Sequence, residues 1–98
     1  RLARELSLLH VEGIRELLRA ERADLVCVHG QTVFHAPPLS WQLMQPAPIA
    51  AGLGCPVISD LRQADLASGR QGAPLTPLAD WIFFRERARR VAVVNLGG

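Results

Sequence analysis

The fold is decided by the stretch at residues 25–32, which reads LVCVHGQT. Its first four residues form an apolar, valine-rich run that is too short for a helix, so a buried β-strand fits. The run ends abruptly at His29-Gly30, and a glycine directly after a strand permits a tight turn and a close approach of ligand to backbone. The stretch therefore predicts a buried strand with polar residues at its carboxyl end.

Two further apolar runs repeat this pattern. Residues 57–59 (VIS) precede Asp60, and residues 91–94 (VAVV) precede Asn95. We interpret both runs as buried strands. In open α/β sheets ligands collect at the carboxyl ends of the strands, so we expect His29, Asp60 and Asn95 to share one crevice.

The segments between these runs predict mainly helices. Residues 2–20 place leucine and isoleucine at spacings of three or four, with Arg and Glu on the other face, which is typical of an amphipathic helix. Residues 46–53 predict a short helix, because prolines are tolerated in a first helical turn and Gly54 suits the C-terminal cap. We expect a helical turn at residues 61–68, a helix at residues 75–87, and an irregular excursion at residues 33–45. The alternation of helix and strand indicates an α/β fold.

Composition excludes several functions. All eleven basic residues are Arg, so no Lys can serve as a Schiff base, a phosphate-loop cation or a general base. Basic and acidic residues alternate in the helical regions, which argues against nucleic-acid binding. Residues 25–59 carry no charge, but prolines and glycines divide them into pieces far shorter than the ~20 apolar residues of a membrane span.

The two cysteines, Cys27 and Cys55, lie in apolar runs and are interpreted as buried free thiols, which favours a reducing, cytoplasmic setting. The chain lacks an initiator Met and stops directly after a strand-like run, so we expect it to be a segment of a longer protein.

Three clusters of polar and glycine residues could carry chemistry. In the first, His29, Gln31 and Thr32 supply donors and acceptors for hydroxyl or amide groups, although a capped strand end would look the same. The uncharged stretch holds further polar residues that could face a neutral ligand such as a sugar. Together with Gln31 and Thr32 these are His35, Ser40, Gln42 and Gln45.

The second cluster, at residues 59–65 (SDLRQAD), places Asp65 about one helical turn after Arg62. Asp60 or Asp65 could act as a base or accept a hydroxyl group or a metal ion. The alternative is a helix-capping Asp60 and an ordinary surface ion pair. The third cluster, at residues 69–75 (GRQGAPL), could present backbone N–H groups to an anion. It lacks the Lys and the Ser or Thr of a nucleotide-binding P-loop.

Taken in order, these motifs resemble one family. HGQTVFH at residues 29–35, Asp60-Leu61-Arg62, Asp65, and QGAPL at residues 71–75 are similar in order and spacing to the anhydro-N-acetylmuramic acid kinases. Residues 93–98 (VVNLGG) look like the next glycine motif of that family. The resemblance implies an actin-like, ribonuclease H-like sugar-kinase fold of two α/β domains. Residues 1 to about 90 would belong to the sugar-binding domain, and residues 91–98 would lead toward the second.

The family's activity follows as an expectation. With ATP and Mg²⁺ it opens the 1,6-anhydro ring of anhydro-N-acetylmuramic acid and phosphorylates O6 in cell-wall recycling. By resemblance, Asp65 would be the general base, Asp60 the second choice, and Arg62 would orient the base or bind sugar. Substrate contacts would come from His29, Gln31, Thr32, Gln71 and Gly72. The ATP phosphates would meet Asn95, Gly97 and Gly98, and no protein metal ligand is expected.

Two positions depart from the family pattern. Leu61 replaces a Phe, which is a mild apolar exchange, and Arg70 replaces a Gly, which could be strained if the loop needs a positive φ there. Two other classes stay open. One is a non-catalytic module that binds sugar or peptidoglycan fragments, and the other is a metal-free hydrolase using Asp65 and His29. The segment alone is not expected to turn over, and a homodimeric parent protein is compatible with the resemblance.

Overall fold

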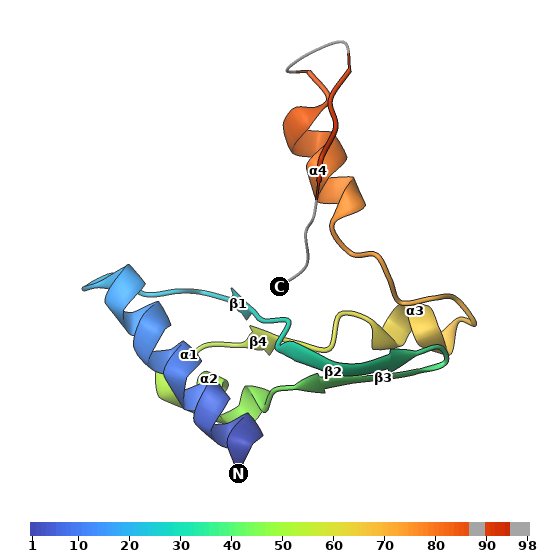
Figure 1. The fold of residues 1–98 in the computed structure, drawn as a ribbon. Coiled ribbons are helices and arrows are strands. Elements are labelled where there is room, and N and C mark those ends of the chain that lie inside the picture. Colours follow the sequence, from blue (N-terminus) through green and yellow to red (C-terminus); the bar gives the residue numbers. More distant parts are fainter. Residues whose placement is uncertain (87–89, 95–98) are drawn as a thin grey trace.

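The computed structural model describes residues 1–86 and 90–94, which form a mixed α/β arrangement (Figure 1). The predicted α/β class is confirmed. The elements follow in the order α1 (Leu2–Leu18), β1 (Val26–Cys27), β2 (Gln31–Ala36), β3 (Leu39–Leu43), α2 (Pro46–Leu53), β4 (Val57–Ile58), α3 (Gln63–Ala67) and α4 (Pro77–Phe84).

The strands β1 and β4 form a small parallel sheet, with Val26 opposite Val57. The pairing continues past the end of β1, where the N–H of Val28 donates to the carbonyl of Ile58 at 2.9 Å. Both strands were predicted from their apolar runs. Because they are parallel, their carboxyl ends lie at the same edge, so the residues that follow the two strands are brought together.

The core lies between this sheet and the helices α1 and α2. It is built around Val11 of α1, Val26, Val28 and Ile49 of α2. The two helices pack closely because residue 52 is glycine, since a Cβ there would lie 2.8 Å from a methyl of Val11. The predicted helices at residues 2–20 and 46–53 are therefore confirmed. No helix in the described ranges has the length and apolar character needed to cross a bilayer.

The ends of α2 show the usual preferences of proline for the first helical turn and of glycine for the C-terminal cap. Pro46 opens the helix, where its missing N–H costs no hydrogen bond. Gly54 closes it with φ 68°, in the left-handed region, and donates its N–H to Ala50 at 2.9 Å.

The prediction of an irregular excursion at residues 33–45 is wrong. The chain forms an antiparallel hairpin, β2–β3, in which Gln31 lies opposite Leu43 and Ala36 opposite Leu39. The register shifts between Thr32 and Phe34, which breaks the alternation of side chains and hides the strand from a periodicity search. The tandem prolines at residues 37 and 38 lie at the hairpin turn, where they interrupt no ladder bond.

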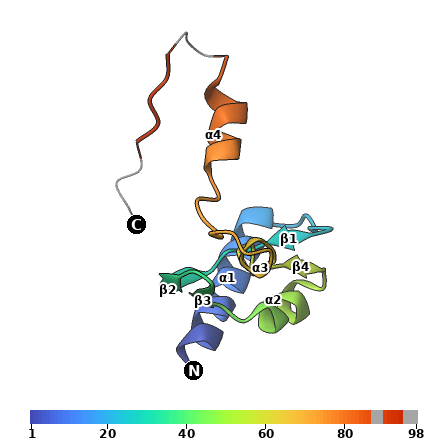
Figure 2. The same cartoon turned by 90° about the vertical axis from the view of Figure 1, so that its right-hand side faces the viewer.

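The C-terminal third differs from expectation at one place. The turn at residues 61–68 and the helix at residues 75–87 appear as the shorter α3 and α4, and α4 projects away from the other elements (Figure 2). Residues 91–94 are not a strand in the described structure, and Val91, Val93 and Val94 are exposed. An apolar run becomes a strand only when another strand lies beside it, and these residues have none in the described part of the chain.

Candidate functional site

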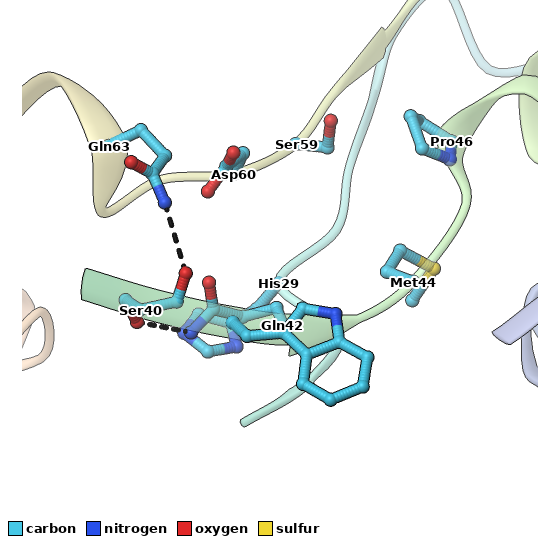
Figure 3. A pocket seen from close by; sticks show the side chains of 9 residues that line it. His29, Ser40, Gln42, Met44, Pro46, Ser59, Asp60 and Gln63 are labelled. Carbon is cyan, nitrogen blue, oxygen red and sulfur yellow. Dashed lines mark hydrogen bonds between the residues drawn. The ribbon is translucent and has the colours of Figure 1, made fainter. Parts of the chain in front are cut away.

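A pocket of about 210 Å³ lies between the β2–β3 hairpin and the segment that leads from β4 into α3 (Figure 3). His29, which follows β1, and Asp60, which follows β4, both line it. The prediction that these two residues share a crevice is thereby confirmed. Asn95, the third residue expected there, lies outside the described residues, as do Gly97 and Gly98. The other residues lining the pocket are Ser40, Trp41, Gln42, Met44, Pro46, Ser59 and Gln63.

The turn at His29-Gly30 connects the parallel sheet to the hairpin. A ring nitrogen of His29, Nδ1, lies 2.8 Å from the carbonyl oxygen of Gly30. Gly30 has φ 77°, and a Cβ at this position would lie 2.7 Å from the Cβ of Met44. Glycine is therefore required here for both conformation and space, and it lets the hairpin approach the end of β1.

The structure separates Gln31 and Thr32 from this pocket. Gln31 is exposed and borders a different cavity of about 470 Å³ beside α1 and β1, which His29 also lines. Thr32 is half-buried and lies opposite Gln42 in the hairpin. Of the three residues predicted from the first motif, His29 is the one that lines the pocket.

Asp60 has an unusual backbone. Its φ of 58° lies in the left-handed region, which Asp tolerates better than most residues. The turn leaves its side chain exposed, and Figure 3 shows its carboxylate directed toward the hairpin. Three residues later, the amide of Gln63 donates to the backbone carbonyl of Ser40 at 3.2 Å, which joins the two walls of the pocket.

Asp65 has a different role, because it accepts hydrogen bonds from the glycine-rich loop at residues 69–75. Its Oδ2 accepts the N–H of Gly72 at 2.7 Å, and its Oδ1 pairs with Arg70 at 3.4 Å. Its backbone carbonyl also accepts the N–H of Arg70 at 3.1 Å, while Gly69 donates to Leu66. The loop N–H groups of Gly69, Arg70 and Gly72 are thus used internally. The prediction that this loop offers them to an anion is wrong at these three positions, because Asp65 and Leu66 already accept them.

Arg62 holds the other side of the loop. Its Nη1 donates to the carbonyl of Gly72 at 2.7 Å, and its Nε is buried without a hydrogen-bond partner. The ion pair of Asp65 is formed with Arg70, not with Arg62 one helical turn back. The positive φ in the loop belongs to Gly69 and Gly72, so the Arg70 substitution introduces no backbone strain. Gln71 is exposed and Gly72 is buried.

Some pocket residues were not found from the sequence. The sequence predicts that the polar residues Ser40 and Gln42 face a neutral ligand, and both line the pocket. It does not predict the same for Trp41, Met44 and Gln63, because nothing in the local pattern shows that the hairpin folds back over Asp60. The signal available was the Trp itself, a large aromatic residue in an uncharged, proline-bounded segment.

Polar side chains make up most of the lining of the pocket. Within residues 1–86 and 90–94 no group of three or more His, Cys, Asp and Glu side chains converges. Cys27 and Cys55 are free thiols, with Cys27 exposed and Cys55 half-buried, so the expectation that both are buried is wrong. Cys27 sits at the end of a two-residue strand that leaves its outer face open.

Comparison with known proteins identifies the relatives of this chain. All of residues 1–98 match the family model described as "Anhydro-N-acetylmuramic acid kinase". The chain is 43% identical over 96 residues to the protein of that name from Rhizorhabdus wittichii, covering 91% of this chain and 26% of the relative. It is 46% identical over 93 residues to the one from Streptomyces avermitilis, covering 90% and 24%. The chain therefore spans about a quarter of the length of these curated relatives.

Proposed function

Since the chain belongs to the anhydro-N-acetylmuramic acid kinase family, we propose that the protein carrying it phosphorylates 1,6-anhydro-N-acetylmuramic acid with ATP. A water molecule that loses its proton to a carboxylate attacks C1 and breaks the bond from C1 to O6. The freed O6 takes the γ-phosphoryl group of Mg-ATP, giving N-acetylmuramic acid 6-phosphate and ADP. The observation that carries the proposal is the pocket shared by His29 and Asp60, in a chain that matches the family throughout.

We assign the two carboxylates separate roles. Asp65 is the general base, because a base must be held in a fixed orientation and the N–H of Gly72 holds one of its oxygens at 2.7 Å. Its side chain is 37% exposed and its other oxygen pairs with Arg70 at 3.4 Å, so this exposed ion pair must open for that oxygen to take a proton from water. Asp60, which lines the pocket, holds a sugar hydroxyl group and is the second candidate for the base. Arg62 acts on the base indirectly, because it donates a hydrogen bond to the carbonyl of Gly72.

The remaining assignments follow from position. His29 contacts the sugar from the end of β1. Gln31 and Thr32, which lie on β2 outside this pocket, are the proposed contacts to substituents of the sugar. Gln71 and Gly72 are the remaining proposed substrate contacts, in the loop whose Gly72 N–H holds the base. The proposed contacts to the ATP phosphates, Asn95, Gly97 and Gly98, lie outside the described residues, and Mg²⁺ enters as part of the Mg-ATP substrate.

The proposal extends to the whole protein. It comprises an actin-like, ribonuclease H-like fold, with residues 1 to about 90 in the sugar-binding domain and residues 91–98 leading to the second. It also comprises a cytoplasmic location and compatibility with a homodimer. The proposed fold is supported by the mixed α/β arrangement, in which the parallel strands place His29 and Asp60 at one edge of the sheet.

The test uses the full-length protein with 1,6-anhydro-N-acetylmuramic acid and Mg-ATP, with mass spectrometry for the sugar phosphate and a coupled assay for ADP. The wild type should form both products. Asp65→Asn should lower kcat by about a hundredfold or more while sugar binding by calorimetry is retained, since general-base catalysis contributes on this scale. Asp24→Asn, which changes an exposed carboxylate outside the site, is the matched control.

Two outcomes would change the assignment. Normal turnover by Asp65→Asn together with an inactive Asp60→Asn would move the base to Asp60. A wild type that binds the sugar but forms neither ADP nor a sugar phosphate would replace the kinase with a non-catalytic sugar-binding module.

A further inference from the structure

We propose that Trp41 is a specificity-determining residue whose indole ring packs against the non-polar C–H face of the sugar ring. This inference rests on the proposed function and names a contact within the same site. Trp41 lines the pocket together with His29 and Asp60, and the residue is 58% exposed.

The first observation is how β3 presents itself to the pocket. Ser40, Trp41 and Gln42 are consecutive, yet all three line the pocket. Successive side chains of a strand point to opposite faces, so the pocket must lie along the edge of β3 rather than over one face. The hydrogen bond from the Gln63 amide to the backbone carbonyl of Ser40 confirms that this edge faces α3. A ligand in the pocket is therefore within reach of the side chain of Trp41.

The second observation is the chemical composition of the pocket. The β4–α3 wall supplies Ser59, Asp60 and Gln63, which are all polar, whereas the wall that begins at the hairpin combines the polar Ser40 and Gln42 with the apolar Trp41 and Met44. A sugar ring likewise combines hydroxyl and amide groups around its edge with C–H groups on its faces. Binding pockets for small molecules combine apolar and aromatic walls with a few placed polar groups in this way.

The third observation is that the indole ring has no other described partner. A ring contact joins Arg85 to Trp81 on α4, and Trp41 takes part in no such contact with the described residues. Trp41 lies opposite Phe34 in the hairpin and remains more than half exposed. Covering a large aromatic surface is favourable, and the electron-rich face of the indole suits C–H groups that carry a partial positive charge. Asp60 and Gln63 can then hold the polar edge of the same ring.

The test measures initial rates of the full-length protein against the sugar at saturating ATP, and against ATP at saturating sugar. Trp41→Ala should raise KM for the sugar by about five- to tenfold, because an aromatic packing contact contributes on this scale. The values of kcat and of KM for ATP should stay within about twofold of wild type, because the contact stabilises the ground state and the transition state alike. Trp41→Phe should restore most of the affinity. Leu39→Ala is the control, since Leu39 is an exposed residue of the same strand that does not line the pocket.

Direct titration of the sugar by calorimetry separates this inference from the proposed function. If the wild type makes the sugar phosphate and Trp41→Ala binds sugar as tightly as wild type, the assignment of Trp41 is overturned and the kinase stands. If the wild type binds sugar without phosphorylating it, a weakened Trp41→Ala still supports the contact while the kinase fails. A wild type that binds no sugar overturns both. Should Trp41→Ala not fold, Trp41→Leu, which keeps apolar bulk without a ring, should show the same rise in KM, and an unchanged KM would refute the role of the ring.

Discussion

Gly72 is a residue with little freedom to change. It has φ 64°, its N–H is held by Asp65, and its carbonyl is held by Arg62. A Cβ at this position would lie 2.8 Å from the Cγ of Leu66. The loop that supports the proposed base therefore depends on the absence of a side chain at a single position.

Gly72→Ala should lower the free energy of unfolding by about 2–4 kcal/mol, because it combines a left-handed backbone with a steric clash. Gly69→Ala is the matched control. Gly69 has φ 78°, but a Cβ there would meet no atom within 4 Å, so only the backbone cost of about 1 kcal/mol applies. Urea unfolding measures the free energy of unfolding of both variants. Equal losses would show that the side chain of Leu66 moves away from the added Cβ without an energetic penalty.

At the scale of elements, a hydrogen bond to one buried hydroxyl group of α1 holds the junction between β3 and α2 in place. Ser7 is 0% exposed, and its Oγ accepts the backbone N–H of Gln45 at 2.9 Å while donating to the carbonyl of Ala3 at 2.8 Å. The thioether of Met44 lies 3.3 Å away. This contact fixes the end of the hairpin next to Met44, which lines the pocket.

Ser7→Ala should cost about 1–3 kcal/mol of stability, because it leaves the N–H of Gln45 without its acceptor in a part-buried position. Ser68→Ala serves as the comparison, since the hydroxyl group of Ser68 makes one local bond on the exposed surface and should contribute well under 1 kcal/mol. Chemical denaturation of both variants provides the measurement. A loss at Ser68 equal to that at Ser7 would contradict the role given to burial.

At the scale of the whole molecule, α4 stands apart from the core. Its eight residues, PLADWIFF, include a single charged side chain, and none of them is buried. Leu78 and Phe83 are each 68% exposed. A helix that is apolar on all sides is usually buried on all sides, and the described residues of this chain provide no such cover.

For the 98-residue chain studied by itself, backbone amides of α4 should exchange with solvent much faster than those of α1 and α2. An eight-residue helix without packing is marginal in water, because isolated helices shorter than about 12–15 residues are rarely stable. Hydrogen exchange followed by mass spectrometry or NMR gives the comparison. Protection of α4 equal to that of α1 would show that it packs in solution.

Much of the framework follows from the sequence alone, because the responsible forces act locally. Apolar spacing indicates α1, proline and glycine mark the ends of α2, and short apolar runs mark β1 and β4. The meeting of His29 and Asp60 was also predictable, since adjacent parallel strands end at one edge. The ordered motifs further identified the family, which the match over residues 1–98 confirms.

Tertiary structure alone decided the rest. The β2–β3 hairpin was hidden by a register shift and by tandem prolines, and only its folded position brings Trp41 into the same pocket as Asp60. The apolar run at residues 91–94 has the composition of a strand but no partner among the described residues, and pairing is a property of two segments. The loop motif was recognisable from its residues, yet the N–H groups of Gly69, Arg70 and Gly72 turn inward because Leu66 and Asp65 accept them. The bond from Gly72 to Asp65 is a three-dimensional contact between residues seven apart.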